Sequence, residues 1–436
     1  MGATTEGIRQ DETGVIAVNL LEIGDPPAQF GTVETVTNPG GIAHAEALVT
    51  CALSATCPNP GAVEQSANGV DLAENSLTID GVLAIEAVAA ASGASATATA
   101  FIDTAIYQRA EADGEAIDLF GVAGTLDVAA SADAVANDGN AFAAAIISDA
   151  IVIDAIGGTA AEVEFDNDGV ITLSAMADAR ATGTGPATAP YTAFANAFVA
   201  GLNAQATVTG DGSALVDLAN AGTIAVVADA HASATGVARA RATAAYGLFG
   251  QAMASGDGDA GVILDNSGDI LVAAEADGTG GHTGTGWAIA VGGLIGIASA
   301  QGEGDAAVQI DNGGSLVVSA DAQGHGTTNG EALAIAVTAV YGIAHAATGD
   351  ALVTLNNSGS ISLLADAEAS GLVAMATAIV GGAIFAGGVF QSAAAANGSA
   401  FGSIDNGGQI LMSAEADAVC GAEYGARSEA RTNVRN

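Results

Sequence analysis

The chain has 436 residues, with 8 basic and 49 acidic side chains and a formal net charge of −41. So few cations cannot neutralise phosphates, which excludes nucleic acid as a partner and also a polybasic membrane-surface patch. Half of the residues are hydrophobic, so the chain should fold despite its charge. With 60 glycines and 4% aromatic residues, its core must use small side chains that let backbone layers pack closely.

The first 67 residues differ in composition from the rest. Cys51 and Cys57 predict a small disulfide loop there, with two unpaired thiols as the alternative. The first six residues lack the basic start and apolar segment of a signal peptide, so we expect export with a removed leader or by a leaderless route. Residues 1–67 are predicted to cap the array that follows, or to donate a strand such as residues 14–21 to a second subunit.

Residues 68–426 form an imperfect repeat array. The phrase Ile-Asp-Asn-x-Gly-x-Ile recurs with small changes, for example as LDNSGDI at 264–270 and IDNGGSL at 310–316. Successive copies lie between 45 and 53 residues apart, which gives a period of about 46. The recurring asparagines are Asn167, Asn220, Asn266, Asn312, Asn357 and Asn406, and the glycines that close each turn are Gly169, Gly222, Gly268, Gly314, Gly359 and Gly408.

The residues after each turn alternate with period two, as in a strand with one buried face. In one copy Ile270, Val272 and Ala274 lie on one face, and Leu271 and Glu275 lie on the other. Strands and turns at a fixed spacing predict an all-β fold, a parallel β-solenoid of about seven to eight repeats. We expect the stacked asparagines to form a hydrogen-bonded ladder and the glycines to take positive φ. Whether one period makes one coil or two stays open.

These phrases resemble the β-helical repeats of bacterial autotransporter passengers and filamentous haemagglutinin-type adhesins, over about 80% of the chain. The resemblance implies a surface adhesin or fibre. Since the sequence lacks the C-terminal barrel of the autotransporters, membrane insertion is not expected.

The other half of each period is apolar on both faces, at Trp287–Ala300, Ala332–Ala346 and Gly371–Phe390. The last segment is long enough for a membrane-spanning helix, but it shares its repeat phase with shorter relatives, which favours a strand. Continuous apolar character indicates a strand covered on both sides. We expect a second subunit to cover the outward residues, with residues 1–67 as the alternative cover. These outward residues include Leu333, Ile335, Val337, Tyr341 and Ile343.

Acidic residues recur seven positions after the turn glycine and predict a column on the outer surface. Carboxylates stacked at strand spacing repel one another unless they are screened or bridged. Two interpretations stay open, a solvated acidic surface and calcium bound between neighbouring carboxylates. The candidate calcium ligands, with calcium as the candidate cofactor, are Asp229, Glu275, Asp321, Asp366 and Glu415.

Catalysis is not expected, although polysaccharide lyases and hydrolases also use right-handed β-helices. Such sites need a cation near the carboxylates, and the array offers only Arg109, Arg180, Arg239 and Arg241. The sequence therefore predicts an extracellular or cell-surface structural protein that associates with itself into filaments, a matrix or a surface layer. The alternative is an adhesin passenger that binds a cell-surface ligand. Residues 427–436 are expected to be a basic tail.

Overall fold

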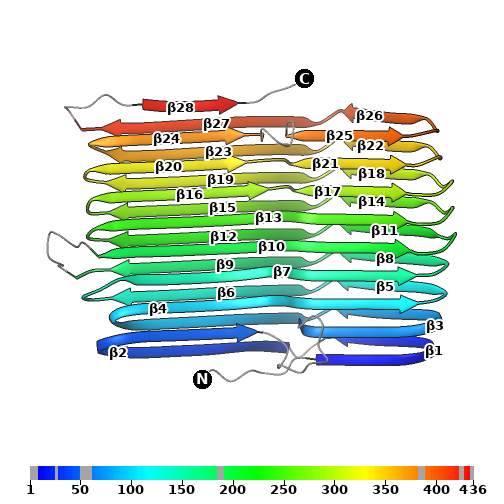
Figure 1. The fold of residues 1–436 in the computed structure, drawn as a ribbon, viewed down its shortest axis with the longest axis horizontal. Coiled ribbons are helices and arrows are strands. Elements are labelled where there is room, and N and C mark those ends of the chain that lie inside the picture. The colour runs from blue at the N-terminus through cyan, green and yellow to red at the C-terminus, as the bar shows by residue number, and fades with distance from the viewer. Residues whose placement is uncertain are drawn as a thin grey trace.

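The computed structural model describes residues 8–24, 28–49, 61–183, 191–381, 388–421 and 427–432. Within these ranges the chain consists of β-strands without a helix, and each strand pairs in parallel with strands of the neighbouring coils (Figure 1). The fold is therefore the parallel β-solenoid that the repeats predicted. The predicted disulfide between Cys51 and Cys57 lies outside the described residues.

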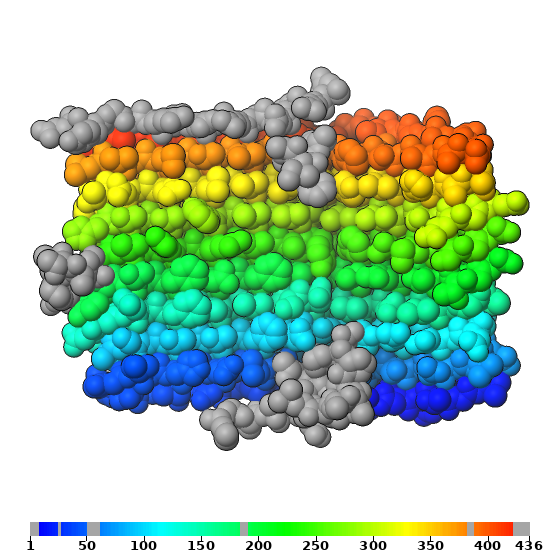
Figure 2. All heavy atoms as spheres, viewed as in Figure 1, coloured from blue at the N-terminus to red at the C-terminus, as the bar shows by residue number. Residues whose placement is uncertain are grey.

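One sequence period forms one coil. Asn220 pairs with Asn266, and Asn266 pairs with Asn312, so residues one period apart lie on adjacent parallel strands. This settles the choice between one large coil and two small ones. Neighbouring coils appear as successive bands of colour in the space-filling view, so each coil touches mainly the coil before it and the coil after it (Figure 2).

Each coil is flattened into two broad sheets, which we call sheet 1 and sheet 2. Sheet 1 holds the strands before and after the Asn-x-Gly turn, and sheet 2 holds the returning strands, which contain a bulge. The strands of sheet 1 are β5 (Glu115–Val122), β6 (Thr125–Ala136), β8 (Ala160–Asn167), β9 (Val170–Ala181), β11 (Ser213–Asn220), β12 (Thr223–Ala234), β14 (Ala260–Asn266), β15 (Asp269–Gly280), β18 (Ala306–Asn312), β19 (Ser315–Gly326), β22 (Ala351–Asn357), β23 (Ser360–Gly371), β26 (Ala400–Asn406) and β27 (Gln409–Cys420). The strands of sheet 2 are β7 (Ala141–Gly157), β10 (Thr192–Val208), β13 (Val237–Ala254), β16 (Thr283–Val291), β17 (Leu294–Ala300), β20 (Asn329–Ala336), β21 (Val340–Ala346), β24 (Val373–Val380), β25 (Val389–Ala395) and β28 (Arg427–Thr432).

The first coils use longer strands that bend from one sheet into the other. These strands are β1 (Ile8–Ile23), β2 (Ala28–Val49), β3 (Gly61–Ile79) and β4 (Val82–Ala112). β1 pairs with β3 and β2 pairs with β4, so residues 8–23 and 28–49 belong to the first coil at one end of the stack (Figure 1). At the other end, β28 pairs with β24.

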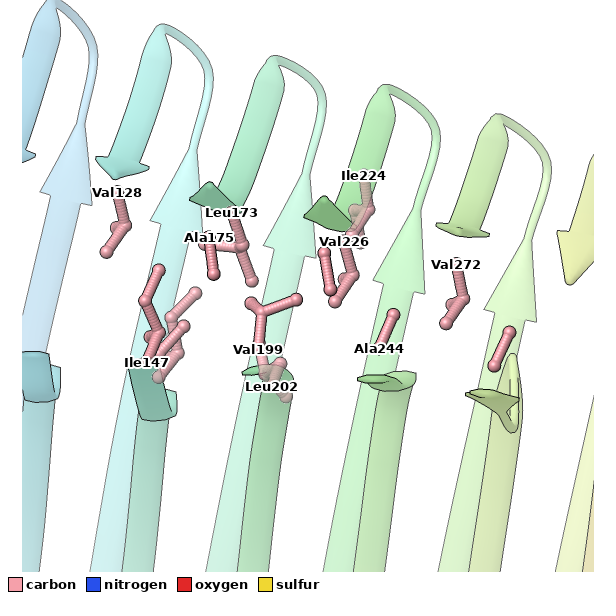
Figure 3. Close-up of a cluster of buried hydrophobic side chains, with 14 of the residues drawn as sticks. Val128, Ile147, Leu173, Ala175, Val199, Leu202, Ile224, Val226, Ala244 and Val272 are labelled. Atoms are coloured by element: carbon pink, nitrogen blue, oxygen red, sulfur yellow. The ribbon is translucent and has the colours of Figure 1, made fainter. Parts of the chain in front are cut away.

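The core between the two sheets narrows along each coil because the inward side chains change in size. Near the Asn-x-Gly turn, branched residues such as Leu173, Val226 and Leu202 point between the sheets (Figure 3). Further along, the inward positions of β12 and β13 are alanines, which bury little volume and allow the sheets to approach. The inward residues Ile270, Val272 and Ala274 of β15 show the same change from branched residues to alanine.

At the narrow end of the core, glycines allow the backbones of the two sheets to come into direct contact. A Cβ atom on Gly286 of β16 would collide with the carbonyl oxygen of Ala276 in β15, and one on Gly284 would collide with that of Gly278. Gly324 and Gly330 repeat the arrangement one coil further on. Glycine is required here by close approach of the backbones.

The asparagine ladder is present as predicted. In each step the Nδ2 of one asparagine donates to the Oδ1 of the next, over 2.7 Å from Asn167 to Asn220 and 2.8 Å from Asn220 to Asn266. The ladder continues through Asn312 and Asn357 to Asn406. These bonds satisfy polar groups that are otherwise buried in the core, from Asn167 to Asn357.

The predicted positive φ of the turn glycines is wrong. Among the described residues, positive φ occurs at Gly292, Gly381 and Tyr246 only. A Cβ on Gly268 would instead collide with the carbonyl oxygen of Gly222 one coil earlier, and Gly314 lies in the same way against Gly268. Glycine recurs in these turns because adjacent coils pack backbone on backbone.

The corner at which each coil passes from sheet 2 into the next strand of sheet 1 has its own ladder, made by aspartates. Oδ1 of Asp259 accepts a hydrogen bond of 2.8 Å from the backbone N–H of Asp305, and Asp305 accepts one of 2.7 Å from Asp350. Asp350 accepts one from the backbone of Ser399. The Gly-Asp phrase recurs at this corner because each carboxylate fixes the backbone of the next coil.

Candidate functional site

The five predicted acids form a column on the outer face of sheet 1. Strand register places Asp229 beside Glu275, Glu275 beside Asp321, and Asp321 beside Asp366, with Glu415 at the end. A groove of about 450 Å³ runs along four of these acids, from Glu275 to Glu415. Burial and the neighbouring carboxylates of Asp366 and Glu275 raise the pKa of Asp321.

A second column, two residues further along each strand, contains a cation. His231 lies beside Asp178 and Asp277 in the adjacent coils, and its Nε2 lies 2.9 Å from Oδ1 of Asp229. The close contact with the Asp229 carboxylate, together with the charges of Asp277 and Glu275, raises the pKa of His231 to about 9. His231 therefore carries a positive charge at neutral pH and partly neutralises this end of the acidic surface.

The acids do not converge into a metal-binding group. In the described part of the chain, no three histidine, cysteine, aspartate or glutamate side chains come together closely enough to hold a metal ion. The carboxylates stand side by side along the solenoid axis, each on its own coil. Such an arrangement creates a strongly negative surface, because neighbouring like charges add to one local potential.

Sheet 2 differs from sheet 1 in charge. From β10 to β25, its only arginine, aspartate and glutamate residues are Arg239, Arg241 and Glu331. The strands of sheet 1 in the same coils, β11 to β27, hold no arginine or lysine. Their acidic residues are Asp217, Asp229, Asp265, Asp269, Glu275, Asp277, Asp311, Asp321, Asp366, Glu368, Asp405, Glu415 and Asp417. The two broad faces of the solenoid are therefore chemically distinct.

The outer face of sheet 2 is apolar in the segments that lack polar alternation, as predicted, whereas β10 and β13 also present polar residues such as Asn203 and Gln251. The expected residues Leu333, Ile335, Val337, Tyr341 and Ile343 all point outward and are half-buried among their neighbours. Of the first 67 residues, 8–23 and 28–49 do not cover them, because these two segments belong to the first coil of the stack. Residues 373–380 and 389–390 of the segment considered as a membrane helix are strand.

The bulge of sheet 2 adds an apolar hollow to this face. A hollow of about 240 Å³ lies between Phe249, Ile295 and Tyr341. Here Tyr246 takes a positive φ of 36°, a conformation that costs energy for a residue with a side chain. Its hydroxyl donates to Oδ1 of Asp149 over 3.0 Å, which anchors the ring.

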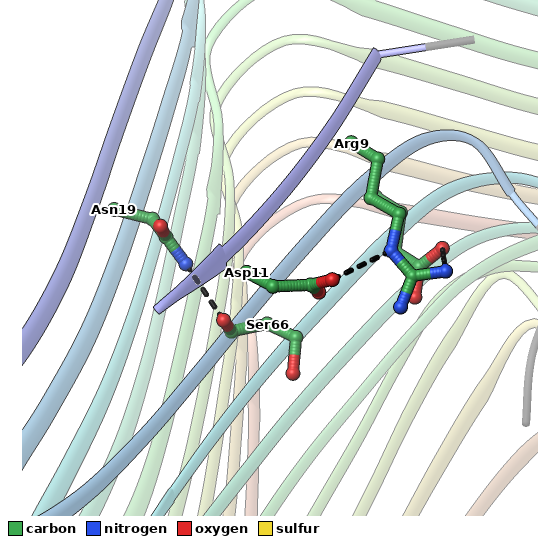
Figure 4. Close-up of polar contacts among 5 residues, drawn as sticks. Arg9, Asp11, Asn19 and Ser66 are labelled. Carbon is green, nitrogen blue, oxygen red and sulfur yellow. Dashed lines mark hydrogen bonds and ion pairs between the residues drawn. The ribbon is translucent and has the colours of Figure 1, made fainter. Parts of the chain in front are cut away.

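The first three coils contain a buried polar interior that the repeat phrase did not predict. Nε2 of Gln108 donates to Oε1 of Gln65 over 2.9 Å, and Gln65 donates to Gln10 over 2.8 Å. Facing them, Asn19 donates to Oδ1 of Asn75 over 2.9 Å and to the backbone oxygen of Ser66 over 2.9 Å (Figure 4). The signal was available, since Gln65 and Gln108 are 43 residues apart and lie at one repeat phase.

Three arginines with described side chains have carboxylate partners. Arg9 donates through Nε to Oδ2 of Asp11 over 2.7 Å (Figure 4). Arg109 lies 3.0 Å from Glu111, and Arg180 pairs with Asp178. None of these groups adjoins the acid column of Asp229 to Glu415 in the register of the strands.

No protein-family model, curated protein or solved structure matches the chain. The structure itself therefore defines the class, a β-helical repeat protein whose parallel coils stack around a nearly closed core. Within the described ranges, no helix has the length and apolar character needed to span a bilayer.

Proposed function

We propose that the chain is a structural protein that assembles with copies of itself, with sheet 2 as its main contact surface. The observation that carries the proposal is the separation of charge between the two broad faces. Sheet 1 presents columns of carboxylates, whereas sheet 2 from β10 to β25 presents aromatic, aliphatic and uncharged polar side chains with almost no charge. Large apolar surfaces of this kind usually mark interfaces in soluble proteins.

The size of sheet 2 supports a stable interface. β10 spans 17 residues, so the sheet is about 55 Å wide at about 3.3 Å per residue. The coils from β10 to β25 add about 24 Å in height at about 4.8 Å per strand. The resulting area of roughly 1,300 Å² for each copy exceeds the roughly 800 Å² that a typical stable complex buries on each partner.

Sheet 1 gives the assembly its orientation. Two acidic faces repel each other, and an acidic face against an apolar face would bury carboxylates without partners. Contact between the sheet 2 faces of two copies leaves the acids in water, where they keep the assembly soluble.

The ends of the solenoid offer a second contact surface. Ile404 and Ile410 occupy inward positions of the last complete coil, yet they are 55% and 38% exposed, whereas Leu355 and Ile361 one coil earlier are fully buried. Contact at such ends would extend pairs of chains into filaments, a matrix or a layer. The resemblance to passenger and haemagglutinin-type repeats supports an extracellular or cell-surface location, and the same resemblance keeps adhesion as the second function.

The test compares matched substitutions on the two sheets. Ile335→Glu places a charge on sheet 2, and Val317→Glu places the same charge at a half-buried outward position of sheet 1. We expect wild type and Val317→Glu to associate in analytical ultracentrifugation and to form regular particles in negative-stain electron microscopy, and Ile335→Glu to stay monomeric. Monomeric wild-type rods at all concentrations would contradict the proposal. The same experiment with a calcium chelator tests whether the acid column contributes through bound calcium.

A further inference from the structure

Arg239 and Arg241 stand apart from the other arginines of the array. Both lie on β13 and point outward from sheet 2, two residues apart. Within the described ranges, neither has an ion pair, whereas Arg9, Arg109 and Arg180 each have at least one. An arginine without an ion pair on the weakly charged face of a chain with a net charge of −41 indicates a surface that meets a carboxylate from outside the chain, and Arg239 is the one whose column also contains a glutamate.

A carboxylate of the same chain lies at the matching position one coil beyond. Arg239 pairs in register with Thr285 of β16, and Thr285 pairs with Glu331 of β20. Arg239 and Glu331 therefore share one column, one coil before and one coil after Thr285. A hollow of about 360 Å³ lies between them, with Thr285 and Trp287 in its lining.

This arrangement is self-complementary under a two-fold rotation about an axis along β16, in the plane of the interface. The rotation keeps each position along the strands and exchanges the coil before β16 with the coil after it. Arg239 of one copy then faces Glu331 of the second copy, and Glu331 of the first faces Arg239 of the second. Reciprocal pairing of this kind defines an isologous dimer interface.

We propose that two copies of the chain dimerise through sheet 2 about a two-fold axis along β16, with Arg239 of each copy paired to Glu331 of the other. The inference rests on the proposed self-assembly and specifies its geometry. Strands of the two copies run in the same direction, and their coils stack in opposite directions. The hollow and the surrounding apolar surface become the centre of the dimer.

Other residues fit the same axis. Trp287 lies on β16 itself and is 40% exposed, so the two Trp287 rings meet at the centre, each beside the hollow of the other copy. Phe249, one coil before the axis, faces Tyr341 of the second copy, which lies one coil after it. Aromatic side chains in a dry centre supply most of the binding energy of such interfaces.

The two charge pairs fix register more than they add affinity. Burying an arginine and a glutamate costs desolvation energy that their attraction offsets only when the geometry is good. In the proposed alignment Arg241 faces Leu333 of the second copy, two residues along the strand from Glu331. An interface shifted by one coil would break both Arg239–Glu331 pairs and leave their four charged groups without partners. The pairs therefore select one alignment among many that apolar stacking alone would permit.

Charge reversal tests the pairing directly, with dissociation constants from sedimentation equilibrium as the readout. Arg239→Glu and Glu331→Arg each create two repulsive contacts in the dimer, and we expect each to weaken it at least tenfold. The double variant restores both pairs and should dimerise within about threefold of wild type. A mixture of the two single variants should form a mixed dimer, because every pair across its interface is then opposite in charge. Arg180→Glu, on sheet 1, serves as the control and leaves the dimer unchanged.

The outcomes separate this geometry from the proposed function. If Ile335→Glu abolishes association but the charge variants do not change it, self-assembly through sheet 2 stands and the two-fold alignment is wrong. Failure of the mixed variants to associate would also overturn the alignment. If wild type is monomeric and Arg239 instead binds free glucuronate in a calorimetric titration, both proposals are wrong and the surface receives an acidic sugar.

Discussion

The side-chain amide of Asn75 donates a hydrogen bond of 2.7 Å to Oδ1 of Asp118, in a part of the core where both side chains are fully buried. The backbone N–H of Ala110 donates to the other carboxyl oxygen over 3.0 Å. Burial dominates over these two bonds and raises the pKa of Asp118 to about 8. A carboxyl group thus ends the polar column that starts at Asn19.

The pH dependence of stability should report on Asp118. In the unfolded chain its pKa is near 3.8, so the unfolded state loses the proton at lower pH than the folded state. Stability therefore falls as pH rises from about 4 to about 8, by an amount of the order of 4 kcal/mol at pH 7. Asp118→Asn removes this loss. We expect its melting temperature to change much less between pH 5 and pH 8 than that of wild type.

The exposed Asp113 provides the control for this measurement. Asp113→Asn, a substitution at an exposed surface position, should keep the wild-type dependence of stability on pH. Equal slopes for Asp118→Asn and wild type would show that the dependence arises from the many surface carboxylates instead.

Removing one step of the asparagine ladder should destabilise the whole solenoid. Asn266→Ala leaves the Nδ2 of Asn220 and the Oδ1 of Asn312 without their partners. Each orphaned buried group costs about 1–3 kcal/mol, so we expect a loss of about 2–5 kcal/mol in chemical denaturation. Asn329→Ala, at an exposed position, should cost less than about 0.5 kcal/mol. A loss below that limit for Asn266→Ala would contradict the structural role of the ladder.

The contact between the two sheets at Gly286 should tolerate no side chain. A methyl group there would collide with backbone oxygens of Ala276 in β15 and of Gln323 in β19. Since neither backbone can move without breaking strand pairing, Gly286→Ala should cost about 3 kcal/mol or more. The matched control is Gly313→Ala, whose added Cβ would lie 3.7 Å from Oγ of Ser358, an ordinary contact. Thermal melts that coincide for the two variants would refute the close approach.

Neutralising acids of adjacent columns should have opposite effects. Asp321 lies between Glu275 and Asp366, so Asp321→Asn removes repulsion and should stabilise by roughly 0.5 kcal/mol at low salt. Asp277 lies between His231 and Gln323, so Asp277→Asn removes an attraction and should destabilise. Both effects should shrink in 1 M salt.

Calcium distinguishes the two interpretations of the acid column. Melting Asp321→Asn with calcium and with a chelator gives the same gain in both conditions if the carboxylates are only solvated. If Asp321→Asn is less stable than wild type in calcium but not in the chelator, the column binds metal.

The features that recur in every repeat could be predicted from the sequence. Alternation after Gly268, the inward Ile270 and the Asn266 ladder follow from period and residue type, and all are present. The reason for the turn glycines was mistaken, because contact between backbones of adjacent coils depends on how closely the coils stack, which no single repeat reveals. The polar interior at Gln65 was missed because the early coils lack the Asn-x-Gly phrase.

The two chemically distinct faces of the solenoid were predicted only in part, because their relative placement depends on how the coil is folded. Apolar strands such as Ala332–Ala346 and the acids of sheet 1 were each visible in the sequence. Their placement on opposite faces required the coil to be known. The relation of Arg239 to Glu331 depends on a register of 46 residues per coil, and only the paired strands establish it.

Because one coil equals one sequence period, the gene can gain or lose whole coils by duplication or deletion of a single repeat. Asn220 and Asn266 are 46 residues apart and stack directly, so an in-frame duplication of that stretch would insert one complete coil. The added coil would continue the asparagine ladder, the acidic face and the apolar face together. Unequal recombination between repeats could therefore lengthen or shorten the rod in steps of about 4.8 Å without disturbing its cross-section.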